Sequence, residues 1–169
     1  MNVEYTNEID LTNENEVSYW QSINDGVMGG ESQGRLTYCA NASMFTGNIS
    51  LENNGGFSSI KRTIEQLPAG LDLVDIDIAG DGLTYQLRMA IFVNGYRLAY
   101  KHDFTTTLGK RECIQLKLSD FKASFRGRYV EGAPELSSAN IIESGFLLTH
   151  NTACSFKLTL FKIKFYKMA

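Results

Sequence analysis

The chain has 169 residues, of which 43% are hydrophobic and 21% charged, with a formal net charge of −3. This length and composition predict one globular domain over residues 1–169 with a core of its own. The acidic balance argues against nucleic-acid binding. No apolar run approaches the roughly 18 residues of a membrane span, and the first residues lack a targeting pattern, so we expect a cytoplasmic protein.

Cysteine count and charge distribution add two expectations. An odd number of cysteines without an export signal predicts free thiols in a reducing compartment. These are Cys39, Cys113 and Cys154. Acidic side chains precede Arg35 without a basic one, whereas the residues after Glu143 include lysines but no acid. Two solvated edges that attract each other would explain this asymmetry, and so would a patch that docks a partner.

Residues 1–16 are polar and acidic, and Ile9 and Leu11 are their strong apolar anchors. They predict a loosely held arm or an edge strand in front of a folded unit over residues 17–167. Residues 20–30, Trp-Gln-Ser-Ile-Asn-Asp-Gly-Val-Met-Gly-Gly, predict a loop, since glycine reaches positive φ at no steric cost. Residues 51–59 repeat this character, and we expect the two loops to lie near each other.

Apolar residues alternate with polar ones in most of the remaining chain, which is typical of strands with one buried face. This pattern covers Leu36–Leu51, Phe57–Arg62 and Ile114–Leu118. Residues 74–104 predict a three-stranded antiparallel meander, with turns at Gly80-Asp81-Gly82 and Asn94-Gly95. Asn-Gly is the strongest two-residue hairpin signal because a type I′ turn needs positive φ at both positions.

The last third of the chain follows a less regular pattern. Residues 119–140 predict irregular structure, and Gly145–Thr149 predicts a strand buried on both faces. Apolar residues then occupy even positions to Leu160 and odd positions from Phe161, a change of phase that predicts a β-bulge. No window sustains a 3.6-residue apolar period. The chain therefore predicts an all-β sandwich or barrel of about ten short antiparallel strands with few or no helices.

Several motifs together resemble the CIA30 family, the complex I intermediate-associated protein 30 group. They are Trp20, Asn24-Asp25-Gly26-Val27-Met28-Gly29-Gly30 with Ser32, Phe45 with Gly47, Ser50-Leu51-Glu52-Asn53-Asn54-Gly55-Gly56-Phe57-Ser58-Ser59, Gly80-Asp81-Gly82, Phe125-Arg126-Gly127-Arg128 and Gly145-Phe146. The resemblance covers Trp20 to Tyr166. It implies a galactose-binding-like jelly roll and a role in assembling NADH:ubiquinone oxidoreductase. The sequence departs from the family pattern in two ways. Glu112-Cys113 stands in a strand where family members often carry a tryptophan, and the mitochondrial targeting extension is absent.

The resulting hypothesis is a non-catalytic protein without a cofactor that contacts a protein partner, such as a subunit of a respiratory or other membrane complex. The predicted contact residues are Trp20, Asn24, Asp25, Gly26, Met28, Gly29, Gly30, Asn53, Asn54, Gly55, Gly56, Phe57, Arg126 and Arg128. Two alternatives accompany them. In the first, structural alternative, the loop side chains would form hydrogen bonds with the backbone of their own loops, and Trp20 would lie in the core. The arginines would grip a ligand carboxylate or phosphate, or pair internally with Asp81 or Asp25.

The second functional class is a carbohydrate-binding module, because this fold commonly carries sugar sites. It predicts exposed aromatic rings on a concave sheet face, drawn from Tyr85, Tyr96, Tyr100 or Tyr129. The cysteines and histidines lack zinc spacing, and Asp75 with Asp77 would need further oxygen ligands to hold calcium, so no metal is expected. No nucleophile elbow or phosphate loop is present, which leaves a Cys–His pair as the remaining enzymatic alternative.

Overall fold

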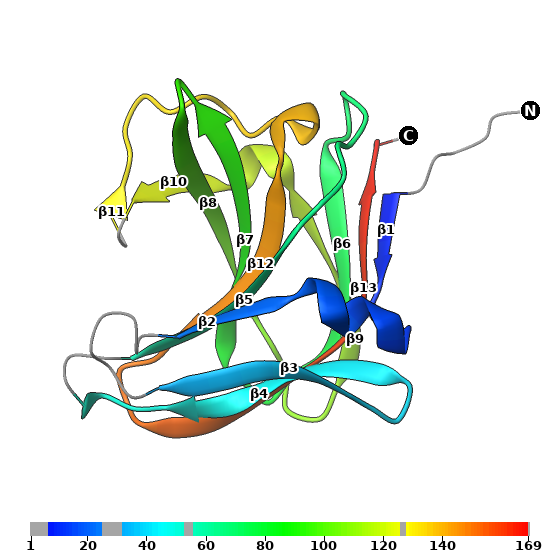
Figure 1. Cartoon of the computed structure of the whole chain (residues 1–169), viewed down its shortest axis with the longest axis vertical. Coiled ribbons are helices and arrows are strands. Elements are labelled where there is room, and N and C mark those ends of the chain that lie inside the picture. The colour runs from blue at the N-terminus through cyan, green and yellow to red at the C-terminus, as the bar shows by residue number, and fades with distance from the viewer. Residues whose placement is uncertain (1–6, 25–31, 53–55, 126–127, 169) are drawn as a thin grey trace, which may run out of the picture.

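The computed structural model describes residues 7–24, 32–52, 56–125 and 128–168 (Figure 1). Within these ranges, the chain forms two antiparallel sheets that face each other across a common core. The expected all-β sandwich of antiparallel strands is confirmed. In the described part of the chain, three short 3₁₀ helices lie between strands, namely η1 (Glu14–Tyr19), η4 (Leu118–Asp120) and η5 (Ser138–Asn140).

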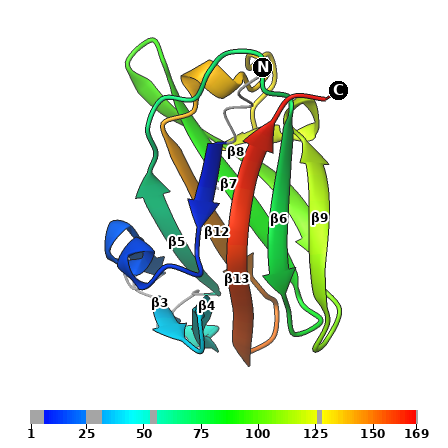
Figure 2. The same ribbon diagram turned by 90° about the vertical axis from the view of Figure 1, so that its right-hand side faces the viewer.

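The first sheet, sheet A, is built around the long C-terminal strand (Figure 2). Its order is β3 (Gln33–Cys39), β4 (Ala42–Ile49), β13 (Cys154–Tyr166), β6 (Leu73–Ala79) and β9 (Arg111–Lys117), and β1 (Asn7–Asp10) also pairs with β13. The predicted β-bulge is confirmed, because the register between β13 and β6 shifts between Leu160 and Lys162. The extra residue lets β13 bend, so that it pairs with β4 in its first half and with β1 in its second.

The second sheet, sheet B, curves so that its outer face is concave, on the left of Figure 1. Its order is β11 (Arg128–Tyr129), β10 (Lys122–Phe125), β8 (Tyr96–Thr105), β7 (Thr84–Val93), β12 (Glu143–Thr149), β5 (Phe57–Thr63) and β2 (Gln21–Asn24). The β7–β8 hairpin is confirmed, with Asn94 at φ 51° and Gly95 at φ 83°. Positive φ at both positions is what its two-residue turn requires.

The core lies between the two inner faces and follows from the alternation in sequence. Phe45, Tyr85 and Phe146 are completely buried, and Phe45 contacts Phe156 with ring centroids 4.8 Å apart. Burying each such side chain stabilises the fold by about 1.5–3 kcal/mol. The same alternation places Gln86, Arg88 and other polar residues of sheet B on its outer face.

The predicted three-stranded meander is wrong. Strand β6 pairs with β13 and β9 in sheet A, whereas β7 belongs to sheet B. Gly80-Asp81-Gly82 therefore crosses from one sheet to the other. A Cβ at Gly80 would lie 2.1 Å from the Cβ of Thr106, so only glycine fits at the start of this crossing. Alternation predicts which side of a strand is buried, but not which strand lies beside it.

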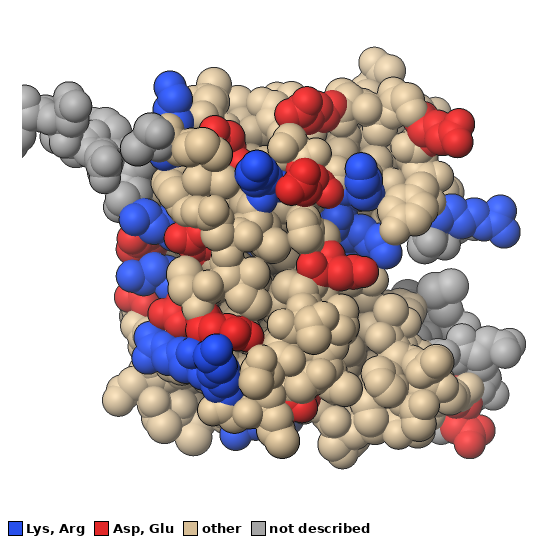
Figure 3. All heavy atoms as spheres, turned by 180° about the vertical axis from the view of Figure 1, so that it is seen from behind, with Lys and Arg blue, Asp and Glu red and all other residues tan. Residues whose placement is uncertain are grey.

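The N-terminal segment is an edge strand followed by η1, a helix that the sequence pattern did not predict. Glu8 of β1 lies 3.9 Å from Lys162 of β13, so the acidic and basic ends of the chain attract each other in sheet A. Seen from behind, Figure 3 shows acidic and basic side chains interspersed on the left side of the molecule. Of the two explanations for the charge asymmetry, the paired edge is the one that these contacts support.

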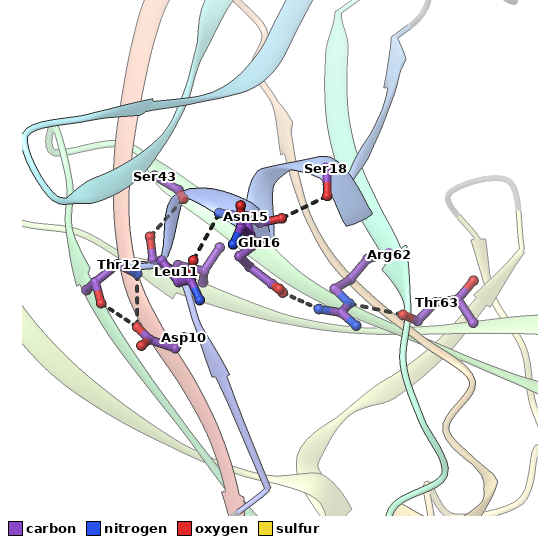
Figure 4. A network of polar contacts seen from close by, with 10 residues as sticks. Asp10, Leu11, Thr12, Asn15, Glu16, Ser18, Ser43, Arg62 and Thr63 are labelled. Atoms are coloured by element: carbon purple, nitrogen blue, oxygen red, sulfur yellow. Dashed lines mark hydrogen bonds and ion pairs between the residues drawn. The ribbon is translucent and has the colours of Figure 1, made fainter.

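Polar contacts hold Leu11 against sheet A and η1 against sheet B (Figure 4). The hydroxyl of Ser43 in β4 donates to the carbonyl of Leu11 at 2.8 Å, and Arg62 in β5 forms an ion pair with the buried Glu16. The Arg62 guanidinium also lies 4.8 Å from the ring centroid of Tyr19. As a result, η1 holds Tyr19 beside the outer edge of sheet B.

Candidate functional site

The described residues that flank the two glycine-rich loops contact one another. Asn24 at the end of β2 pairs with Ser58 of β5, whose hydroxyl donates to Asn24 Oδ1 at 2.5 Å. The Ser32 hydroxyl donates to the Ser50 carbonyl at 3.0 Å and accepts from the Ser50 amide at 2.8 Å. The residues on either side of the loops are therefore held together by hydrogen bonds within the fold, as the structural alternative expects.

Most of the predicted contact residues lie outside the described residues. These are Asp25, Gly26, Met28, Gly29, Gly30, Asn53, Asn54, Gly55 and Arg126. Of the others, Gly56 and Phe57 lead into β5, and Arg128 is exposed on the edge strand β11. Asn24 is half-buried; its side chain accepts a hydrogen bond from the Ser58 hydroxyl and donates one to the Gly34 carbonyl.

Trp20 lies in the core. Its side chain is only 9% exposed, and its ring stacks on Phe146 with centroids 6.2 Å apart. The structural alternative, with Trp20 in the core, is therefore correct, since η1 and β2 turn the ring inward.

Asp81 is engaged within the fold rather than with an arginine. It accepts hydrogen bonds from the Tyr85 hydroxyl at 2.9 Å, from the Lys157 amide at 2.8 Å and from the Leu83 amide at 3.2 Å. Burial and the Asp81 carboxylate keep the pKa of Tyr85 far above its ordinary value. Among the described residues Asp81 forms no ion pair, so the expected Arg128–Asp81 pairing is not found.

A row of basic side chains crosses the concave outer face of sheet B. Consecutive cross-strand partners run from Lys122 in β10 to Lys101 in β8, Arg88 in β7, Gly145 in β12 and Lys61 in β5. We call Lys122, Lys101, Arg88 and Lys61 the cationic row. Sequence reasoning missed it because these residues are far apart in the chain and only the register of the strands aligns them.

Arg88 occupies the middle of the cationic row and is half-buried. Its guanidinium donates to Gln86 Oε1 at 2.9 Å, and no carboxylate of the described residues lies within ion-pair distance of it. Burial and the nearby charge of Arg97 lower the pKa of Arg88. A half-buried cation without a counterion favours an anionic ligand, because that ligand would replace the missing hydration and charge.

The neighbouring acid is already paired. Glu143 lies 2.8 Å from Arg97 and 3.5 Å from Lys61. Burial alone would raise the pKa of Glu143, but its hydrogen bonds with Arg97 and the charges of Arg97 and Lys61 outweigh burial and lower it. The Glu143 carboxylate therefore pairs with Arg97 and Lys61 and not with Arg88.

Shallow hollows lie at both ends of the cationic row. One of about 190 Å³ is lined by Tyr19, Gln21, Lys61, Arg62, Thr63 and Glu143. Another of about 190 Å³ is lined by Lys101, His102, Asp103, Asp120, Lys122 and Tyr129. Tyr19 and Tyr129 are 61% and 68% exposed, so each hollow carries one accessible aromatic ring.

A separate polar groove of about 470 Å³ borders the flanks of the first loop. Its lining is Asn24, Gln33, Gly34, Arg35, Thr46, Gly47 and Asn48. A Cβ at Gly47 would lie 1.9 Å from the Gln33 carbonyl oxygen, so the close approach of β3 and β4 accounts for that glycine. The groove contains amide and guanidinium groups but no half-buried cation comparable to Arg88.

The described part of the chain offers neither a metal cluster nor a membrane-crossing helix. It contains no group of three or more His, Cys, Asp or Glu side chains placed to hold a metal ion. None of its helices has the length and apolar character needed to cross a membrane. All three cysteines are free thiols.

This architecture defines a galactose-binding-like β-sandwich. It is similar to the family 11 carbohydrate-binding module of the cellulase Lic26A-Cel5E from Clostridium thermocellum, with a TM-score of 0.70 and 16% identity over 99% of this chain and 97% of that one. The same family 11 module in complex with a β-1,3-1,4-mixed-linked tetrasaccharide gives 0.68 and 16% identity over 96% and 95% of the two chains. At this identity the likeness concerns the fold.

The comparison of sequences assigns the chain to a family. Residues 9–160 match the model of the family described as complex I intermediate-associated protein 30 (CIA30), and the chain belongs to this family. An uncharacterized protein of Schizosaccharomyces pombe is 38% identical over 52 residues, which make up 30% of this chain and 24% of that protein. The matched segment thus spans about a quarter of the curated relative.

Proposed function

We propose that this protein is a non-catalytic binding protein that holds a segment of a protein partner on the concave face of sheet B during assembly of a membrane oxidoreductase such as complex I. The family description supports the assembly role. The free cysteines are compatible with work in a reducing compartment such as the cytoplasm. Some proposed contacts rest on sequence grounds alone, namely Asp25, Gly26, Met28, Gly29, Gly30, Asn53, Asn54, Gly55 and Arg126.

The observation that carries this proposal is Arg88. A guanidinium that is half-buried and lacks a described counterion costs the isolated fold free energy, since its hydration is only partly replaced. The position of Arg88 is therefore better explained by the binding of a ligand than by a contribution to the stability of the fold. By contrast, the family motif residues Asn24, Ser58 and Asp81 are occupied by internal hydrogen bonds.

A site-specific photo-crosslinking amino acid tests the proposed surface in the native host. Asp103 is exposed on the outer face of β8, and Lys117 is exposed on β9 of sheet A. We expect crosslinks from position 103 to a subunit or assembly intermediate of a membrane oxidoreductase, identified by mass spectrometry. Position 117 is the matched control. Identical partners from both positions, or partners from position 117 alone, would refute the assignment.

Carbohydrate binding is the second candidate, and the exposed rings of Tyr19 and Tyr129 favour it. Of the tyrosines expected on the concave face, Tyr85 and Tyr100 are buried and Tyr96 lies at the tip of the β7–β8 hairpin. One structural neighbour, the family 11 module, forms a complex with a mixed-linked tetrasaccharide. Titration with that sugar, for the native chain and for Tyr129→Ala, tests this candidate. Saturable binding that the substitution abolishes would support it over a protein partner.

A further inference from the structure

We infer that the concave face of sheet B binds an extended acidic polypeptide segment, whose carboxylates contact the cationic row. This inference rests on the proposed function and names the chemistry of the partner. Two observations on the cations support it: the basic side chains are aligned, and Arg88 is half-buried without a carboxylate partner among the described residues. Two more concern the rest of the face: the acids lie beside the row, and the described residues at its centre include no aromatic ring.

The alignment sets the size of the ligand. Adjacent strands in a sheet are about 4.8 Å apart, and the row from β10 to β5 crosses four intervals, which gives roughly 19 Å. An extended peptide advances about 3.3 Å per residue, so about six residues would cover the row. Gly145, which lies between Arg88 and Lys61 in this alignment, carries no side chain.

Arg88 is the expected centre of recognition. Its planar guanidinium can donate two parallel hydrogen bonds to one carboxylate, and partial burial strengthens that interaction relative to one in water. The lysines at the ends of the row act as point charges with mobile stems. A row with one forked donor in the middle and ammonium groups at both ends suits several carboxylates spaced along a chain.

The acids on this face are fewer than the cations and lie to the side of the row. Glu143 is engaged by Arg97 and Lys61. Asp103 pairs across the strands with Gln86, and Asp120 lines the hollow beside Lys122. The chain as a whole is acidic, yet this face concentrates basic groups, and such local fields steer ligands of opposite charge.

A peptide fits the centre of the face better than a sugar does. On β7, β8 and β12, the outer-face residues of the row and of the cross-strand set next to it are Gln86, Arg88, Lys101, Asp103, Gly145 and Leu147. None of these six residues is aromatic, so no ring lies there to stack on a sugar, and the exposed Phe92 lies four residues from Arg88, toward the tip of the β7–β8 hairpin. The exposed Tyr19 and Tyr129 stand at the two ends of the row.

Fluorescence anisotropy with a labelled peptide of about eight residues, six of them glutamate, tests the inference. We expect saturable binding to the full chain that weakens as salt rises from about 50 to about 500 mM. Arg88→Ala should weaken binding about 30-fold or more, and Lys101→Ala about two- to five-fold. Arg88→Lys should fall between native and alanine, because it keeps the charge and loses the fork.

Lys162→Ala is the matched control, since Lys162 lies on β13 in sheet A and faces Glu8. It should leave the affinity within about two-fold. Equal losses from Lys162→Ala and Arg88→Ala would overturn the inference, as would failure of the peptide to bind or preferential binding of a uronic-acid polysaccharide or a β-glucan. Thermal unfolding checks each variant, and Lys101→Ala with Lys122→Ala replaces Arg88→Ala if the latter does not fold.

The two proposals fail separately. If position 103 crosslinks to a partner while the acidic peptide does not bind, the proposed function stands and the acidic chemistry is wrong. If the peptide binds through Arg88 but no crosslink to a membrane oxidoreductase forms, the acidic site stands and the assembly role is wrong.

Discussion

Asn24 and Ser58 form a hydrogen bond of 2.5 Å from the serine hydroxyl to the asparagine Oδ1, and the Asn24 side-chain amide also donates to the Gly34 carbonyl at 3.2 Å. Asn24 and Ser58 belong to sheet B and Gly34 to sheet A. One asparagine side chain therefore joins the edges of both sheets at the base of the first loop. This geometry accounts for the motif residue Asn24 by its contribution to the stability of the fold.

Replacing Asn24 by alanine should lower the free energy of unfolding by about 1–3 kcal/mol, because the buried Ser58 hydroxyl and the Gly34 carbonyl lose their partner. Urea denaturation followed by fluorescence measures the change. Asn151→Ala, in an exposed turn, should stay within about 0.5 kcal/mol of the native chain. A loss of less than about 0.5 kcal/mol for Asn24→Ala would show that the hydrogen bonds of Asn24 contribute little to the stability of the fold.

Gly34→Ala should destabilise the sandwich by about 1–3 kcal/mol or more, since its Cβ would lie 2.0 Å from the Ser58 Oγ and 2.9 Å from the Phe156 ring. Combining it with Ser58→Ala removes the nearest obstacle. The double variant should then lose less stability than the sum of the single losses. Strict additivity of the two losses would mean that the chain relieves the contact by moving its backbone instead.

Tyr85→Phe should lower the free energy of unfolding by about 1.5–3 kcal/mol, as expected for a hydrogen bond to a charged group. The Leu83 and Lys157 amides would still hold Asp81, so the crossing between the sheets should persist. Tyr96→Phe at the hairpin tip is the matched control, because the Tyr96 side chain is 78% exposed. Equal melting temperatures for both variants would contradict the role assigned to the Tyr85 hydroxyl.

Stability should decrease in acid partly through Glu143. Its pKa in the fold lies below the ordinary value of 4.5 because Arg97 and Lys61 outweigh the effect of burial. A lowered pKa means that the contribution is present above the unfolded value and is lost as the pH falls through the folded value. We expect Arg97→Ala to flatten the change in unfolding free energy between about pH 5 and pH 3.

Arg35→Ala, on β3 of sheet A, provides the comparison for that pH series. It should keep the native slope. Because Glu143 and Arg97 are partly open to solvent, the difference should be small and should shrink in high salt. A slope that Arg97→Ala leaves unchanged would remove Glu143 from the account of acid sensitivity.

The amino-acid sequence by itself determined the local features of this protein. Alternation with a period of two identified buried faces such as that of Tyr85 and Leu87, Asn94-Gly95 identified the hairpin, and the change of phase at Phe161 identified the bulge. These features follow from contacts between near neighbours and from backbone preferences, which are written in consecutive residues.

Only the tertiary structure decided how distant segments combine. It separated β6 from β7, laid the acidic β1 against the lysines of β13, assigned Asp81 to Tyr85 and aligned the cationic row around Arg88. Strand order and register depend on how the whole core packs, and the partner of a polar side chain depends on what that packing places opposite it. The period of a single strand contains neither kind of information.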